Sequence, residues 1–290
     1  MKILKFTLSG KSAFFKKPDV NSNLYFTYGN VHKIALIGIF GAILGYGGYN
    51  SMNIKRIFNK KSTEKDKGEF PEFYEKLRNL KISITPNGEK GFISKKVQVF
   101  NNSVGYASKE QGGNLIVKEQ WLENPSWDIY LIMDNEESEK IAKSIVEHKC
   151  VYTPYLGKND HIADIGSIEI FKEEQIKILN ETEKLDCLYL KNDFRLNIEE
   201  DDFDDFSDDD IEEKFKYEEK LPYELEKNTN MYIVKSFVYT NINIKKCTDT
   251  EIYNVNEKNI VFYWFSLNKL LYKIHIPGKN ILLIRRGNPP

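Results

Sequence analysis

The first residues that could do chemistry lie in a loop of lysines and aromatic side chains, GKSAFFKKP, at residues 10–18. Lysine ammonium groups neutralise phosphates, and aromatic faces stack on unpaired bases. Interleaving the two suits a groove for single-stranded RNA. The alternative is a solvated basic loop whose two phenylalanines enter the core. The residues expected to contact RNA in this loop and after it are Lys11, Phe14, Lys16, Lys17, Tyr28, His32 and Lys33.

A second candidate is the glycine-rich stretch GAILGYGGY at residues 41–49. Amide N–H groups beside glycine can hold a phosphate. No GK[ST] follows this stretch and it lacks the GxGxxG spacing, so nucleotide hydrolysis and dinucleotide binding are not indicated. The glycines end a helix, which is the wrong end of its dipole for an anion, so close packing of Gly38 and Gly41 is an equal alternative. The expected contacts here are Tyr46, Gly47, Gly48, Lys55 and Arg56.

Two later loops complete the set of candidate RNA contacts. Residues 101–114 carry Tyr106 and Lys109 near the middle of a polar excursion between strands. Residues 151–164, VYTPYLGKNDHIAD, carry Tyr155 and Lys158 on a shaped loop before a strand. His161 lies in the second loop, but no other His or Cys stands at metal-ligand spacing. We therefore expect no metal and no cofactor.

Signatures of common enzymes are missing from the sequence: GxSxG, HExxH and a motif pairing Cys with His are all absent. The one plausible acid–base cluster is His32 beside Tyr28 and Lys33, which could serve metal-independent RNA cleavage. A histidine at the start of an apolar helix is more often structural or a simple RNA contact. We expect no catalytic residue.

Charge is unevenly distributed along the chain. Residues 1–61 hold ten Lys or Arg and one acid, Asp19, whereas residues 199–213 hold eleven Asp or Glu and no base. This indicates a polyanion-facing end and a separate acidic insertion. Three widely spaced cysteines predict neither disulfides nor zinc, and the cytoplasm is the default location. The uncharged segment 34–49 is too short and too rich in glycine for a membrane span, so it predicts a buried helix.

The residue patterns predict an α+β fold. Residues 2–8 alternate as a half-buried strand, residues 31–45 form an apolar helix, and the later order is strand, strand, helix, strand. This is the ferredoxin-like pattern that the RRM shares. We expect a domain over 1–185 and a smaller β-rich part over 186–290 that carries the acidic insertion.

Three stretches resemble the Cas-five family of CRISPR-associated proteins, members of the RAMP superfamily, and most of all its subtype I-B branch. They are FTLSGKSAFFKKPDVNSNLYFTYGNVHKIALIGIFGAILGYGGY, NNSVGYASKEQGGNLIVKEQWLENPSWDIYLIM and VYTPYLGKNDHIADI. The resemblance covers residues 1 to about 170. It implies an RRM-like RAMP domain with a β-hairpin thumb, best matched by residues 100–117.

The resemblance also implies a function. Such proteins hold the 5′ handle of CRISPR RNA at the foot of the Cascade complex, where they contact the large subunit and the first backbone subunit. Target DNA is then met only indirectly. In one branch, subtype I-C, a Tyr, Lys and His set cuts precursor RNA, so an endoribonuclease using Tyr28, His32 and Lys33 is the alternative. Membrane association through residues 34–49 is a weaker one.

Overall fold

A four-stranded antiparallel sheet forms the centre of the computed structural model, which describes residues 1–19, 23–58, 70–102, 105, 109–111, 115–197 and 213–263. Its strands are β1 (Ile3–Ser9), β3 (Ile82–Pro86), β6 (Ser126–Ile132) and β7 (Asp164–Phe171), in the order β3-β6-β1-β7. Helix α1 (Lys33–Leu44) follows β1, and helix α4 (Glu136–Val146) follows β6. Strand order and helix positions are those of a ferredoxin-like domain, which confirms the predicted fold class.

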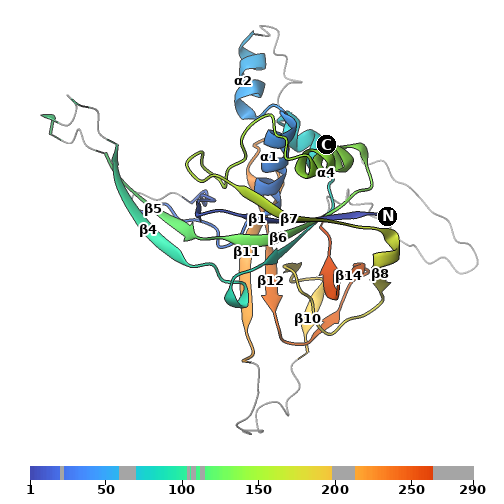
Figure 1. The fold of residues 1–290 in the computed structure, drawn as a ribbon. Coiled ribbons are helices and arrows are strands. Elements are labelled where there is room, and N and C mark those ends of the chain that lie inside the picture. The colour runs from blue at the N-terminus through green and yellow to red at the C-terminus, as the bar shows by residue number, and fades with distance from the viewer. Residues whose placement is uncertain are drawn as a thin grey trace, which may run out of the picture.

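Alternation of side chains along β1 explains the two faces of this sheet. Leu4, Phe6 and Leu8 are buried beneath the helices, and the Phe6 ring meets Phe40 of α1 edge-on at 6.1 Å. Lys5 and Thr7 point to the opposite face. Figure 1 shows α1 and α4 on one side of the sheet and β11, β12 and β14 on the other.

Local signals fix where the helices begin and end. His32 caps α1, and Gly45 ends it in a left-handed conformation (φ 76°), as the glycine-rich sequence predicts. Asn135 and Ser138 form a capping box at the start of α4. Two further helices are α2 (Tyr49–Phe58) and α3 (Glu72–Leu77). In the described part of the chain no helix is long and apolar enough to cross a membrane.

A long hairpin is inserted between β3 and β6. Strands β4 (Lys95–Asn102) and β5 (Leu115–Glu123) pair from Lys95 opposite Leu122 out to Asn102 opposite Leu115. Figure 1 shows this hairpin projecting from the body. It confirms the predicted thumb, but its pairing begins well before residue 100. The short strand β2 (Ser12–Ala13) joins the base of the hairpin beside β5.

The remaining chain is β-rich, as predicted, and packs against the helix-free face of the central sheet. Its elements are η4 (Glu173–Gln175), β8 (Ile176–Leu179), β9 (Tyr189–Leu190), β10 (Phe194–Leu196), β11 (Lys216–Leu225), β12 (Tyr232–Thr240), β13 (Ile244–Lys246), β14 (Ile252–Val255) and β15 (Lys258–Val261), with η2 (Glu89–Gly91) earlier in the chain. One continuous apolar core draws on residues before and after 185. The acidic run lies outside the described residues except for Glu213, which pairs with Lys90.

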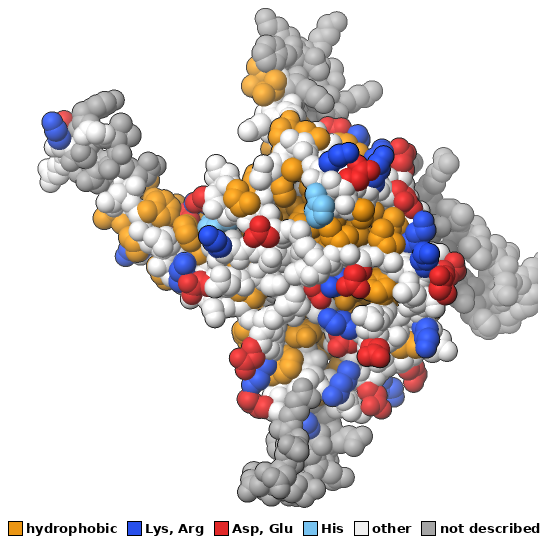
Figure 2. All heavy atoms as spheres, viewed as in Figure 1, with side chains coloured by type: hydrophobic (Ala, Val, Ile, Leu, Met, Phe, Trp, Pro, Cys, Tyr) orange, Lys and Arg blue, Asp and Glu red, His pale blue; other side chains and the backbone are white. Residues whose placement is uncertain are grey.

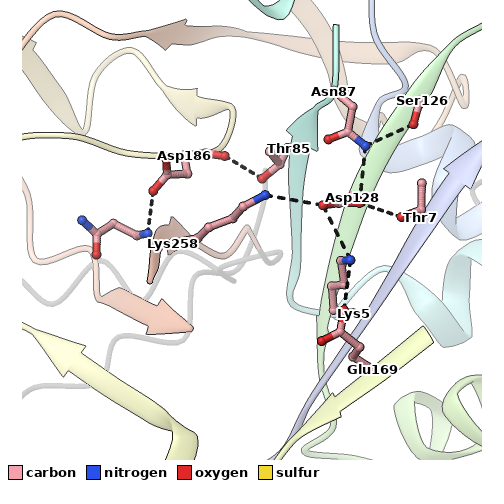
Figure 3. A network of polar contacts seen from close by, with 10 residues as sticks. Lys5, Thr7, Thr85, Asn87, Ser126, Asp128, Glu169, Asp186 and Lys258 are labelled. Atoms are coloured by element: carbon pink, nitrogen blue, oxygen red, sulfur yellow. Dashed lines mark hydrogen bonds and ion pairs between the residues drawn. The ribbon is translucent and has the colours of Figure 1, made fainter. Parts of the chain in front are cut away.

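A polar network closes the helix-free face (Figure 3). The carboxylate of Asp128 accepts a hydrogen bond from Thr7 at 2.7 Å and lies 3.8 Å from Lys5 and 3.5 Å from Lys258 of β15. Asp186 accepts a hydrogen bond from Thr85 through its backbone carbonyl. This face carries RNA in an RRM. Here the chain's own C-terminal strands occupy it.

Candidate nucleic-acid interface

Lysines and aromatic rings gather where residues 10–18, which we call the basic loop, meet the outer edge of β5. The Lys16 ammonium group lies 4.0 Å from the centre of the Tyr25 ring. The Tyr25 N–H donates to the Lys118 carbonyl and the Tyr25 carbonyl accepts the Gln120 N–H, so its backbone is fixed beside the hairpin. Phe26 next to it is 41% exposed. We call Lys11, Lys16, Tyr25, Phe26 and Lys118 the basic strip.

The open face of the hairpin continues the basic strip with apolar side chains. The register places Lys118 opposite Val99, and Asn101 opposite Ile116 on the same face. Val97, Val99 and Ile116 are each more than half exposed. Figure 2 shows hydrophobic side chains gathered along this projecting hairpin. Such a surface offers stacking and apolar contact beside positive charge.

Charge on the basic strip is not neutralised within the described residues. Lys11, Lys16 and Lys118 are exposed and form no ion pair there. Lys17 differs, because its ammonium group lies 3.1 Å from the Glu219 carboxylate. That carboxylate also accepts the Gly29 N–H and the Tyr217 hydroxyl, which attaches the basic loop to β11. Lys17 therefore contributes less net charge to the strip.

Lys158 is also paired internally. Its ammonium group lies 3.1 Å from Glu119, a largely buried carboxylate of β5, and 3.6 Å from Asp160. It also lies within 6 Å of the ring centres of Phe14, Phe100 and Trp121. Tyr155 from the same loop is 44% exposed. This loop covers the second face of the hairpin base, opposite Val99 and Lys118.

Three aromatic members of the expected set lie inside the protein. Phe14, Tyr28 and His32 are each less than 5% exposed. The His32 ring touches Phe15, Tyr28 and Tyr232, and its Nδ1 accepts the Ala35 N–H at 3.2 Å. Burial lowers the pKa of His32 to about 3, so the ring is neutral at pH 7. In this conformation His32 caps α1. This is the structural role that the sequence leaves as the alternative to an RNA contact.

Lys33 is buried too, and its Nζ has no hydrogen-bond partner among the described residues. The ammonium group lies 5.1 Å from the centre of the Tyr223 ring, which Lys235 also approaches, at 3.9 Å. Burial, opposed by Glu224 and aided by Lys235, lowers the pKa of Lys33 to about 7. This lysine is not on the surface that carries Lys16.

The glycine-rich loop lies at the other end of α1, about 18 Å away for a helix of this length. The Gly47 N–H donates to the Glu72 carboxylate at 2.8 Å, so the chain's own anion occupies it. The Tyr46 hydroxyl donates to Glu137, and Lys76 lies over its ring. A Cβ on Gly48 would have no heavy atom of the described residues within 4 Å. The alternative of close packing holds for Gly41, where a Cβ would come within 2.6 Å of Phe73.

The last candidates lie at the edges of the described structure. Lys109 is exposed near the tip of the hairpin. Tyr106 and the side chains of Lys55 and Arg56 lie outside the described residues. Among the described residues, no cluster of three His, Cys, Asp or Glu side chains suits a metal ion.

The contacts expected from the sequence leave out three members of the basic strip, Tyr25, Phe26 and Lys118. Tyr25 lies near the basic loop, but nothing in its spacing separates it from buried Tyr28. Lys118 follows an apolar run, and only the alternation of β5 would place it on the open face. The role of Glu219 in holding the loop had no local signal, because Gly29 and Glu219 are 190 positions apart.

Comparisons with known proteins give a likeness in fold. No protein-family model matches the chain, and a search of curated proteins finds no match. A chain of a CRISPR RNA-guided surveillance complex is 12% identical with a TM-score of 0.45, over 85% of this chain and 92% of its own length. A CRISPR protein from Archaeoglobus fulgidus is 10% identical with a TM-score of 0.46, over 91% of this chain and 100% of its own.

A third solved structure is a type III-B Cmr-beta complex bound to cognate target RNA and AMPPnP. Its matching chain is 11% identical with a TM-score of 0.36, over 90% of this chain and 86% of its own. Each of these three likenesses has a TM-score below 0.5. At these identities the likeness concerns the fold alone, so the function proposed next rests on this chain's residues and on the sequence resemblance.

Proposed function

We propose that this chain is a non-catalytic RNA-binding subunit of a type I CRISPR surveillance complex in the cytoplasm, similar to subtype I-B, and that it caps the 5′ handle of the CRISPR RNA. The observation that carries the proposal is the basic strip. Among the described residues the ammonium groups of Lys11, Lys16 and Lys118 form no ion pair. The Lys16 group lies 4.0 Å from the centre of the partly buried Tyr25 ring, and Phe26 beside it is exposed. Phosphate neutralisation and base stacking are thereby offered by neighbouring segments at the base of the hairpin.

The position of the basic strip suits a protein that caps one end of an RNA strand. It lies at the base of the hairpin β4–β5, so an RNA strand on it would meet the open face of the hairpin next. The apolar side chains of Val97, Val99 and Ile116 would then face bases rather than phosphates. The backbone subunit and the large subunit, which the sequence resemblance implies as partners, would continue the complex beyond this point.

The endoribonuclease alternative is not favoured by the structure. The histidine that it needs as acid or base is His32, which is buried and engaged in capping α1. Efficient proton transfer uses a group whose pKa lies near the working pH, and burial holds the pKa of His32 at about 3.

The test is the salt dependence of RNA binding. We expect the purified chain to bind single-stranded repeat-derived RNA with an affinity that falls as salt rises. For each tenfold rise in salt, the logarithm of the binding constant should fall by about 0.7 per phosphate contact. The double variant K16Q/K118Q should lose about 1.4 units of this slope if each lysine neutralises one phosphate. Fluorescence anisotropy across a salt series measures both slopes.

Lys143→Gln is the matched control, because Lys143 is an exposed lysine on α4, on the helix-covered side of the sheet. Its slope should equal that of the wild type. An unchanged slope in K16Q/K118Q, or an equal loss in Lys143→Gln, would remove the basic strip from the RNA interface. Absence of RNA binding by the wild type would end the proposal itself.

A further inference from the structure

His161 lies where three separate segments of the chain meet. Its Nδ1 is 2.7 Å from the Ser12 hydroxyl of the basic loop. Its ring meets Trp121 of β5 edge-on, with centroids 4.5 Å apart and an interplanar angle of 90°. The side chain has no exposed surface. One histidine on the 151–164 loop thus touches both segments that carry the basic strip.

Hydrogen bonds also fix the backbone around His161. Leu156 donates to the His161 carbonyl at 2.7 Å, and His161 donates to the Lys158 carbonyl at 3.0 Å, which closes a tight loop. Phe14 of the basic loop donates to the Leu156 carbonyl at 3.0 Å. Gly157, with φ 93°, permits this approach, since a Cβ there would lie 2.0 Å from the Phe14 carbonyl oxygen.

The charged groups that the structure describes near His161 are already paired with one another. Asp160 lies 3.8 Å from its Nε2, beyond hydrogen-bonding distance, and Lys158 and Glu119 pair with each other. The Nε2 atom is buried and has no partner among the described residues. Burial lowers the pKa of His161, so the ring is neutral at pH 7 and adds no positive charge of its own. A direct phosphate contact is therefore not its role.

We propose that His161 is a positioning residue for the RNA interface, an inference that rests on the function proposed above. Its hydrogen bond with Ser12 and its contact with Trp121 hold the basic loop against β5. Lys16 on the loop and Lys118 on the strand then keep a fixed separation before RNA arrives. Such preorganisation strengthens binding because less freedom is lost when the complex forms.

The test separates the hydrogen bond from ring packing. His161→Phe keeps a ring against Trp121 but removes Nδ1, and Ser12→Ala removes the other partner. Each variant should weaken binding of a single-stranded repeat RNA about fivefold, the effect of one hydrogen bond. The double variant should bind no more weakly than either single variant, because both remove the same interaction.

Two further readouts distinguish positioning from a phosphate contact and from general unfolding. The salt slope of His161→Phe should equal that of the wild type, because no phosphate contact is lost. His161→Gln, whose side-chain amide can bond the Ser12 hydroxyl, should bind within about twofold of the wild type. If His161→Phe does not fold, Ser12→Ala tests the same hydrogen bond from the other side.

The outcomes separate this inference from the proposed function. Wild-type affinity in both His161→Phe and Ser12→Ala would overturn the positioning role and leave the RNA interface standing. A reduced salt slope in His161→Phe would also overturn it, since His161 would then touch a phosphate. Absence of RNA binding by the wild type would defeat the proposed function instead.

Discussion

Lys16 and Lys33 carry the same ammonium group in opposite surroundings. Lys16 is exposed beside Tyr25, whereas Lys33 is 4% exposed and has no hydrogen-bond partner among the described residues. In the sequence both belong to one basic, aromatic pattern. Composition cannot separate them, because the difference arises from β11 and β12 folding over the start of α1. Burial of Phe14 and Phe15 was one alternative that the sequence left open, whereas burial of Lys33 was not predictable.

Burial of Lys33 predicts a pH-dependent cost to stability. The unfolded chain takes up this proton near pH 10.5, and the folded chain only near pH 7. Between these values the unfolded state binds more protons, so the free energy of unfolding falls as the pH is lowered from about 10.5 to about 7. Lys33→Met should raise the free energy of unfolding at pH 7 by about 1 to 3 kcal/mol.

Chemical denaturation at pH 7 and at pH 10 measures this effect. The increase in the free energy of unfolding that Lys33→Met causes should be smaller at pH 10 than at pH 7. RNA affinity should stay at the wild-type value. A loss of RNA affinity with a smaller salt slope would instead place Lys33 on the RNA. Lys143→Met on exposed α4 is the matched control and should change neither property.

At the scale of elements, the packing of α1 on α3 decides what the glycine-rich segment does. The sequence left phosphate binding and close packing open. In the structure a Cβ on Gly41 would come within 2.6 Å of the Phe73 Cβ, whereas one on Gly38 would be 4.0 Å from the nearest heavy atom. The glycine at 41 thus permits a helix contact, and the sequence alone could not tell which of the two glycines does so.

These two glycines offer a matched pair of variants. Gly41→Ala should lower the free energy of unfolding by about 1 to 3 kcal/mol, because the added methyl group collides with Phe73. Gly38→Ala should leave stability unchanged or raise it by up to about 1 kcal/mol through helix propensity. Thermal unfolding of both variants measures the difference. Equal effects at the two positions would contradict the close contact between α1 and α3.

At the scale of the whole molecule, long-range pairing closes the central sheet. Lys258 forms an ion pair with Asp128, and the Leu188 N–H donates to the Ile84 carbonyl. The C-terminal strands therefore cover the face that an RRM leaves open. Local alternation and caps made β1, α1 and α4 predictable from sequence. The covering of the sheet was not, because its partners lie more than 100 positions apart. The RNA surface that we propose therefore lies at the base of the hairpin and not on the sheet.

The most direct test of this placement is ultraviolet crosslinking of the chain to single-stranded repeat RNA, followed by identification of the crosslinked peptides. We expect crosslinks in residues 11–28 and 115–123, at aromatic side chains such as Tyr25 and Phe26. Crosslinks confined to α4 or to β8 and β14, with none in those two ranges, would contradict an RNA interface on the basic strip.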